Sequence, residues 1–239
     1  MKKALDENIL LKEIIPGHIW VQHAPLRFFG VEVGSRMTVV QLRNNQLFVH
    51  SPLQLNDVIA AQLDNIGRVS YIVSPNNLHH LFIGDYFDHY KHAKFYASPG
   101  LTAKRKDIKF TAELKNEPDP DWAESLDQMI FFGHESFQEV VFYHRFSKTL
   151  IVADLLMNFT ERASSLTKLV TRLMGIYGQP TLPLDFKHSS LQALRFQMSV
   201  KKLMEWDFQR IILAHGDIIP QNGKEVLRQA FEGLNETNN

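Results

Sequence analysis

The stretch Val73-Ser74-Pro75-Asn76-Asn77-Leu78-His79-His80 places two adjacent histidines a few residues after a short apolar run. The run from Arg68 to Val73 is rich in β-branched and aromatic residues and stops at Ser74-Pro75, which predicts a buried strand that ends there. Neighbouring residues of a strand point to opposite faces, whereas an irregular loop can turn both imidazoles towards one point. The stretch therefore predicts a strand followed by a loop with a paired set of donors.

Two further apolar runs end in one ionisable residue each. Leu150-Ile151-Val152-Ala153 leads into Asp154, and Arg210-Ile211-Ile212-Leu213-Ala214 leads into His215. In open α/β sheets, ligands bind just beyond the carboxyl ends of the strands. The three strand ends that carry histidine, aspartate and histidine could therefore converge on one site.

The order of these features resembles the metallo-β-lactamase superfamily. Its signature is a Thr-His-x-His-x-Asp-His loop after a strand, then a lone histidine, an aspartate at a strand end, and a final histidine followed by glycine. His134 in Phe131-Phe132-Gly133-His134 takes the place of the lone histidine, Asp154 that of the aspartate, and His215 that of the final histidine. More narrowly, the pattern resembles an uncharacterised branch of the superfamily with a degenerate metal-binding loop.

The resemblance implies an α/β fold, namely an αββα sandwich of two mixed β-sheets flanked by helices. It also implies a single domain over residues 1–239, with a helical insertion at about 160–206. Two sets of apolar residues at helical spacing predict the helices of this insertion: Leu166, Leu169, Val170 and Leu173, and then Leu191, Leu194, Met198 and Leu203. The insertion could cap the mouth of the site, form the contact of a homodimer, or pack on the sheet as a satellite layer.

The metal loop departs from the superfamily's signature at its start. Pro75 and Asn77 occupy the places of the first two histidines, so the first of the family's two metal sites retains only His134. Proline cannot coordinate an ion, and an amide oxygen is a poor substitute for imidazole at zinc. We therefore expect this first site to be weak or absent.

The second metal site is better preserved. His79 stands where the family has aspartate, while His80, Asp154 and His215 match directly. Three imidazoles and one carboxylate suit one Zn²⁺ or Fe²⁺ ion. The predicted metal ligands are thus His79, His80, Asp154 and His215.

The activity implied by the resemblance is that of a metal-dependent hydrolase with a reduced, mononuclear site. Zinc lowers the pKa of a bound water from about 15.7 to about 7, and this water would attack an ester, amide or phosphodiester of a small-molecule substrate. Asp154 would ligate the metal and orient the water, and His134 would hydrogen-bond the developing oxyanion. The alternative is a non-catalytic protein that keeps the fold and binds a ligand or partner. A third interpretation is an oxidoreductase that uses iron at the same ligands.

Each proposed ligand also has an ordinary structural interpretation. Asp154 could cap a following helix, His215 could lie in a simple strand-to-loop turn, and His79-His80 could be plain loop residues. His134 is a short match with Glu139 as a nearby rival, and His50 could orient a ligand from a strand end. The order of the four features along the chain favours the metal site.

The composition is that of an ordinary globular chain: 239 residues, 44% hydrophobic and 22% charged, with 26 basic and 26 acidic residues. This balance gives no reason to expect nucleic acid as a partner. Lys104, Arg105, Lys106 and Lys109 form a basic cluster that could meet an anionic substrate, although a solvated face is the favoured interpretation. The chain has no cysteine, no run near the roughly 18 apolar residues of a membrane span, and no signal-peptide pattern, so we expect a cytoplasmic protein.

Overall fold

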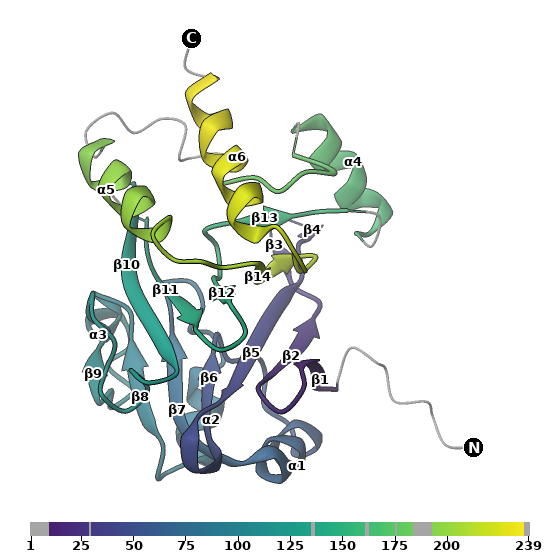
Figure 1. Ribbon diagram of the computed structural model, residues 1–239. Coiled ribbons are helices and arrows are strands. Elements are labelled where there is room, and N and C mark those ends of the chain that lie inside the picture. Colours follow the sequence, from purple (N-terminus) through teal and green to yellow (C-terminus); the bar gives the residue numbers. More distant parts are fainter. Residues whose placement is uncertain are drawn as a thin grey trace.

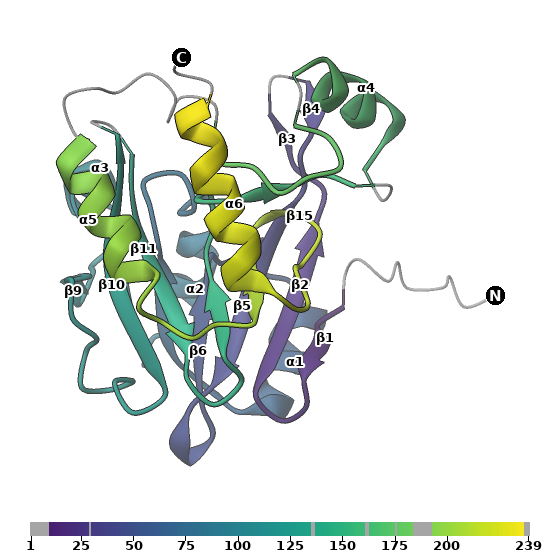
Figure 2. The same ribbon diagram turned by 45° about the horizontal axis from the view of Figure 1, so that its top comes forward.

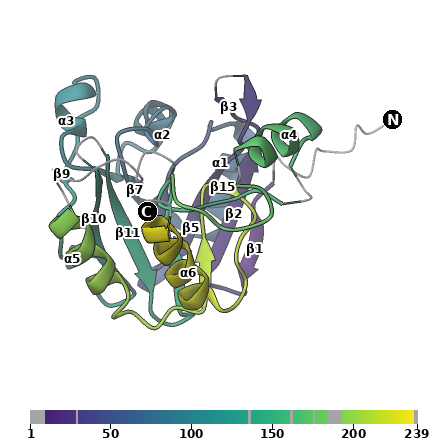
Figure 3. The ribbon, with the colours of Figure 1, turned by 90° about the horizontal axis from the view of Figure 1, so that it is seen from above.

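Two β-sheets lie face to face between layers of helices, as the view along the sandwich shows (Figure 3). The computed structural model describes residues 10–28, 30–134, 137–160, 163–174, 176–183 and 193–236. Within these residues the order of layers is helix, sheet, sheet, helix (Figure 1). The αββα sandwich expected from the resemblance is confirmed.

The first sheet has seven strands and is mixed. In spatial order its strands are β1 (Lys12–Ile15), β2 (Ile19–Ala24), β5 (Ser35–Gln41), β6 (Gln46–His50), β7 (Arg68–Ser74), β8 (Lys94–Ala97) and β9 (Ala112–Glu113). The pairs from β1 to β6 are antiparallel, and those from β6 to β9 are parallel. The turn between β5 and β6, which contains the 3₁₀ segment Arg43–Asn45, places Asn44 and Asn45 at positive φ, a conformation that asparagine tolerates better than most residues.

Helices α1 (Asp57–Ile66) and α2 (Ile83–His89) cover the outer face of this sheet. The side chain of Asn56 caps α1 by accepting a hydrogen bond of 2.9 Å from the backbone N–H of Ile59. Gly67 ends α1 where a Cβ atom would lie 2.3 Å from the carbonyl oxygen of Asn45, so only glycine fits. Helix α1 thus carries the chain from β6 to the parallel strand β7.

The second sheet has four strands and is also mixed. Its order is β10 (Leu126–His134), β11 (Phe137–His144), β12 (Thr149–Ile151) and β14 (Arg210–Ile212), of which only β12 and β14 run parallel. Helices α5 (Ala193–Leu203) and α6 (Gly223–Glu236) cover its outer face (Figure 1). Two β-rich runs, Gln138 to Tyr143 and Lys148 to Ala153, predict the hairpin of β11 and β12, whereas the sequence pattern does not predict β10.

The core between the sheets is aromatic, and its rings pack one sheet against the other. Phe48 meets Trp122 and Phe142 edge-on, with ring centroids 5.2 and 5.1 Å apart. At the end of β7, the backbone N–H of Val140 on β11 donates to the carbonyl oxygen of Pro75 at 2.8 Å. This bond links the two sheets beside the histidine loop.

The two described helices of the expected insertion have different surroundings. Helix α5 packs on β10 as a satellite layer. Helix α4 (Ser165–Leu173) lies beside the small hairpin of β3 (Arg27–Phe28) and β4 (Val31–Glu32), where Thr167 Oγ1 donates to the carbonyl oxygen of Glu32 at 2.6 Å (Figure 2). Its apolar stripe faces outward, with Leu166, Leu169 and Leu173 exposed by 53%, 55% and 80%. The stripe therefore predicts the helix correctly but not its buried face.

In the described part of the chain, we find no helix with the length and apolar character that crossing a bilayer requires. The division into one domain over residues 1–239 stays a prediction.

Candidate metal centre

Three chain segments meet at the carboxyl ends of β7, β12 and β14. His79 lies in the loop after β7, Asp154 follows β12, and His215 opens β15 (His215–Gly216) just after β14. The parallel register of β12 and β14 pairs Ile151 with Ile212, so both strands end at one edge, and the N–H of Ala214 donates to the carbonyl of Ala153 at 3.2 Å. The convergence of strand ends predicted from the sequence is what the structure shows.

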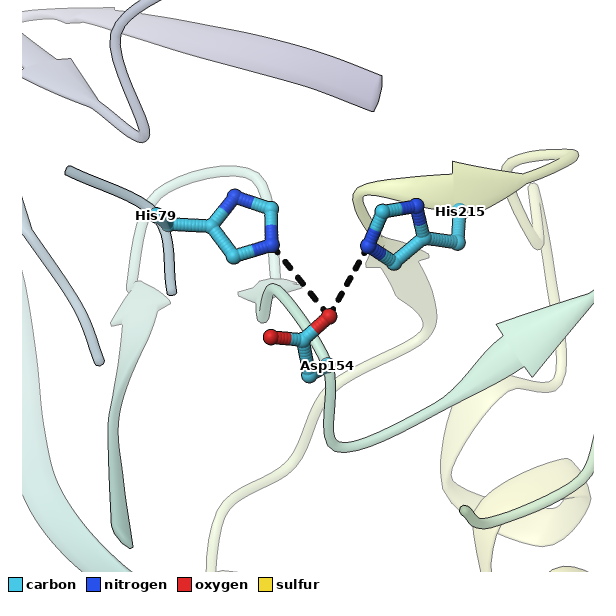
Figure 4. Close-up of side chains that lie close together, drawn as sticks. All are labelled: His79, Asp154 and His215. Atoms are coloured by element: carbon cyan, nitrogen blue, oxygen red, sulfur yellow. Dashed lines mark hydrogen bonds and ion pairs between the residues drawn. The ribbon is translucent and has the colours of Figure 1, made fainter. Parts of the chain in front are cut away.

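One carboxylate oxygen faces two imidazole nitrogens at this point (Figure 4). Asp154 Oδ1 lies 2.8 Å from His215 Nε2 and 3.2 Å from His79 Nε2. The three side chains are only 8%, 8% and 7% exposed, in the order Asp154, His215, His79. Their donor atoms all lie within 4.8 Å of one another, so together they could hold a metal ion.

The charges within this group stabilise one another. Burial alone raises the pKa of Asp154, but His79 and His215 outweigh it and hold the pKa well below its usual range. Burial lowers the pKa of His215, but the hydrogen bond and charge of Asp154 outweigh it and the pKa is raised. The carboxylate is thus held anionic, the form that binds a cation.

The second ring nitrogen of each histidine is also engaged. His215 Nδ1 lies 2.6 Å from the carbonyl oxygen of Gly34, which can only accept a hydrogen bond, so the Nδ1 atom carries a proton. His79 Nδ1 lies 2.5 Å from Ser51 Oγ. Such contacts orient the rings of metal-binding histidines and direct Nε2 to the ion.

Two glycines allow the backbone to approach His215 closely. Gly34 has a φ of +64°, and a Cβ atom there would lie 2.6 Å from His23 Nε2. At Gly216, with a φ of +97°, a Cβ atom would lie 2.0 Å from the carbonyl oxygen of Asn158 in β13 (Met157–Asn158), the strand that pairs with β15. Arg36 donates to the carbonyl of Gly216 at 2.7 Å. The backbone at Gly34 therefore lies against the His215 ring, while Arg36 and Asn158 hold the backbone of the next residue, Gly216.

Asn76 binds the carboxylate of Asp154, and Glu139 binds its backbone N–H. Asn76 Nδ2 donates to Asp154 Oδ2 at 2.8 Å and to Glu139 Oε2 at 3.1 Å, and its Oδ1 accepts from the N–H of His79 at 2.9 Å. The carboxylate of Glu139 accepts from the N–H groups of Ala153 and Asp154 at 2.7 and 2.6 Å. Burial and the charge of Asp154 raise the pKa of Glu139 to about 8. The sequence presents Glu139 only as a rival of His134; the signal for its role beside Asp154 is a lone acid in an apolar strand.

The structure does not bring His80 into this group. The ring of His80 turns to Arg105, whose Nη1 lies 3.0 Å from His80 Nδ1 and 2.7 Å from the His80 carbonyl oxygen. Arg105 is itself held by Asp107 through Nε and Nη2, at 2.9 and 2.7 Å. The interpretation of the basic cluster as a solvated face is therefore wrong for Arg105.

The remaining candidates have distinct positions. His134 ends β10, and its side chain lies outside the described residues. His50 is fully buried edge-on against Phe142, and neither of its ring nitrogens has a hydrogen-bond partner in the described part of the chain. Its neighbour Ser51, and not His50, contacts the candidate ligand His79. Asp154 caps no helix in the described residues, because β13 follows it.

The donor set fits a divalent transition metal. Two imidazole nitrogens and one carboxylate oxygen are ligands that Zn²⁺ and Fe²⁺ prefer, whereas Mg²⁺ and Ca²⁺ prefer oxygen alone. Three protein ligands are also the number found in catalytic zinc sites, which keep one position open. The arrangement therefore suits a reactive ion better than a purely structural one.

Comparisons with known proteins give a family and a fold. A family model described as "Domain of unknown function (DUF4336)" matches residues 16–181, more than half of the chain. No curated protein matches. Similar solved structures include a metallo-β-lactamase from Pontibacter korlensis, with 12% identity, a TM-score of 0.61, and coverage of 93% of this chain and 98% of that one.

Two further similar structures are the DIM-1 metallo-β-lactamase and the FIM-1 enzyme from Pseudomonas aeruginosa in its mono-zinc form. DIM-1 is 15% identical with a TM-score of 0.63, covering 96% of this chain and 98% of its own. FIM-1 is 12% identical with a TM-score of 0.62, covering 96% of both chains. At these identities the likeness shows the fold alone.

Proposed function

The chain belongs to the DUF4336 family and has the metallo-β-lactamase fold, and from this premise we propose that it is a metal-dependent hydrolase with a single-ion site. The observation that carries the proposal is the meeting of His79, Asp154 and His215 within 4.8 Å in a buried position. One Zn²⁺ or Fe²⁺ is the proposed cofactor, because the donors suit both. The mono-zinc form of FIM-1 supports the idea that this fold accommodates one ion.

The three ligands would hold the ion through His79 Nε2, Asp154 Oδ1 and His215 Nε2. A bound Zn²⁺ or Fe²⁺ supplies a Lewis acid that lowers the pKa of water and polarises a carbonyl or phosphoryl oxygen. Asn76 fixes the second oxygen of Asp154, so that Oδ1 stays directed at both imidazoles. The proposed reaction is hydrolysis of an ester, amide or phosphodiester of a small molecule, in which His134 donates a hydrogen bond to the developing oxyanion.

The test combines metal content with activity. We expect near-stoichiometric zinc or iron in the purified, tag-free protein, and loss of both metal and esterase or phosphodiesterase activity in His79→Ala, Asp154→Ala and His215→Ala. The exposed His92 supplies a matched control, since His92→Ala removes an imidazole outside the group and should retain both properties. The identity of the metal separates zinc hydrolysis from iron redox chemistry.

The opposite result would favour a different class of protein. If the wild type takes up neither zinc nor iron on dialysis, the hydrolase proposal fails and a non-catalytic binding protein takes its place. If metal binds but no ester, amide or phosphodiester is cleaved, the metal site is supported and the proposed hydrolysis is refuted. A cytoplasmic location and a homodimer formed through the helical insertion remain proposals alongside the activity.

A further inference from the structure

The contact between Arg105 and His80 determines which ring nitrogen of His80 carries a proton. A guanidinium group has N–H donors and no acceptor, and it keeps its charge in proteins. Arg105 Nη1 lies 3.0 Å from His80 Nδ1, so the Nδ1 atom must accept with its lone pair. In a neutral imidazole the single proton then resides on Nε2.

This arrangement is the reverse of the one at His215. There the Nδ1 atom faces the carbonyl oxygen of Gly34 at 2.6 Å and donates to it, so Nε2, which donates to Asp154 in the metal-free protein, is the nitrogen that would release its proton to bind an ion. For His80 to bind an ion through Nε2, its proton would have to move to Nδ1. Two N–H groups, one from His80 and one from Arg105, would then face each other.

Arg105 cannot simply turn away to relieve that clash. Its Nε and Nη2 are fixed on the carboxylate of Asp107 at 2.9 and 2.7 Å, and its Nη1 also donates to the carbonyl oxygen of His80 at 2.7 Å. Because this second bond ties Arg105 to the loop backbone, the guanidinium moves with the residue it holds. His80 itself is buried, so its ring has little freedom to leave the contact.

We propose that Arg105 keeps His80 out of the metal shell by holding its ring at Nδ1 and its backbone at the carbonyl oxygen, away from the three clustered residues and in the Nε2–H tautomer, so that the ion has three protein ligands and one open position. The inference rests on the proposed metal site and specifies its coordination. The His80 ring accepts a hydrogen bond from Arg105, and Arg105 is a positioning residue that acts through it. A fourth protein ligand would close the position that a catalytic ion needs for water or substrate.

The tautomer can be measured without any metal. Nitrogen–proton correlation spectra of the uniformly ¹⁵N-labelled, metal-free protein distinguish protonated from unprotonated ring nitrogens, and His80→Gln identifies the signals of His80. We expect a protonated Nε2 and an unprotonated Nδ1 for His80, unchanged after addition of one equivalent of zinc. A protonated Nδ1, or a shift of His80 Nε2 to a metal-bound nitrogen on zinc addition, overturns the proposal.

Zinc affinity, measured by competition with a chromophoric chelator, gives a second readout. His80→Ala should bind zinc as the wild type does, whereas His79→Ala should lose binding. Arg105→Met removes the donor and should free His80 to coordinate, raising the affinity by about tenfold, which corresponds to about 1.4 kcal/mol. The gain should vanish in Arg105→Met/His80→Ala and be absent in Lys106→Met, which removes the same charge from a neighbouring exposed position.

The outcomes separate this inference from the proposed function. A loss of zinc affinity in His80→Ala comparable with that in His79→Ala would show that His80 is a ligand and would refute the inference, while leaving the hydrolase proposal intact. Unchanged affinity in Arg105→Met would show that Arg105 does not restrain His80. If the wild type binds no zinc, the proposed function fails, and the spectra of the metal-free protein still decide the tautomer. Should Arg105→Met not fold, His80→Ala and the spectra remain sufficient.

Discussion

His215 and Gly34 are 181 positions apart in the chain, yet His215 Nδ1 lies 2.6 Å from the carbonyl oxygen of Gly34. The bond orients the imidazole so that Nε2 meets Asp154 at 2.8 Å. It depends on the tight backbone conformation just before β5, because Gly34 has a φ of +64° and a Cβ atom there would lie 2.6 Å from His23 Nε2. The candidate metal centre is therefore coupled to a backbone conformation outside the three ligand segments.

Gly34→Ala should weaken both the fold and the metal site. The new methyl group would lie 2.6 Å from His23 Nε2 at a φ that alanine disfavours, which costs about 1–3 kcal/mol of stability and displaces the carbonyl that orients His215. Gly30→Ala is the matched control, because Gly30 also has a positive φ, of +81°, but has no atom within 4 Å of the added methyl group. Urea unfolding and zinc titration of both variants make the comparison. Equal zinc affinity in the two variants would contradict a role for Gly34 in orienting His215.

Glu139→Gln should destabilise the protein, because the amide cannot accept all the hydrogen bonds that Glu139 accepts. Glu139 accepts two backbone N–H groups, from Ala153 and Asp154, and a third N–H from Asn76. An amide has one oxygen, so at least one donor would face the new NH₂ group, and a buried unsatisfied donor costs about 1–3 kcal/mol. Urea unfolding at neutral pH measures the loss, with the exposed Glu205→Gln as control. A variant as stable as the wild type would mean that Glu139 is replaceable at this position.

The buried imidazole of His144 should make the protein less stable as the pH falls. Burial, with a smaller contribution from His18, lowers its pKa from 6.5 to about 4 in the folded state. Below pH 6.5 the unfolded chain binds a proton that the folded chain does not, so stability falls until the pH reaches about 4. The loss attributable to this group is about 3 kcal/mol, at about 1.4 kcal/mol per unit of pKa.

His144→Gln isolates this effect from the other titrating groups. His215 acts in the opposite direction, because its raised pKa favours the folded state at low pH, so the wild-type curve alone cannot be assigned to one residue. We expect the free energy of unfolding to fall less steeply from pH 6.5 to pH 4 in His144→Gln than in the wild type. Parallel curves for the two proteins would contradict the assignment to His144.

The outward leucines of α4 offer a surface for the proposed homodimer. Leu169 and Leu173 are 55% and 80% exposed, although they lie on the apolar stripe of the helix. We expect Leu169→Glu/Leu173→Glu to shift the protein from dimer to monomer in size-exclusion chromatography with light scattering. Leu81→Glu is the matched control, since Leu81 is 62% exposed at a different place on the molecule. A monomeric wild type would refute the dimer.

Much of the fold could be predicted because its signals are local. The β-branched and aromatic run of β7, the glycine at position 67 that ends α1, and the proline after Ser74 are each readable within about ten residues. β10 could not be predicted in the same way, because Gln128 and Gly133 interrupt its apolar pattern and its pairing with β11 depends on the tertiary context. The outward apolar stripe of α4 could not be predicted either. Helical spacing of apolar residues shows that a helix is amphipathic, but it does not show which face packs against the rest of the protein.

The sequence by itself determined the donors and their order: a histidine pair after one strand, an aspartate after another and a histidine after a third. It could do so because an apolar run and the residue that ends it are neighbours in the chain. Only the tertiary structure decided that His79 joins Asp154 and His215 while His80 turns to Arg105. That choice depends on partners 25 to 181 positions away, such as Arg105, Ser51 and Gly34. Hydrogen-bond partners select the ring orientation and the tautomer, and neither property is encoded in the spacing of histidines.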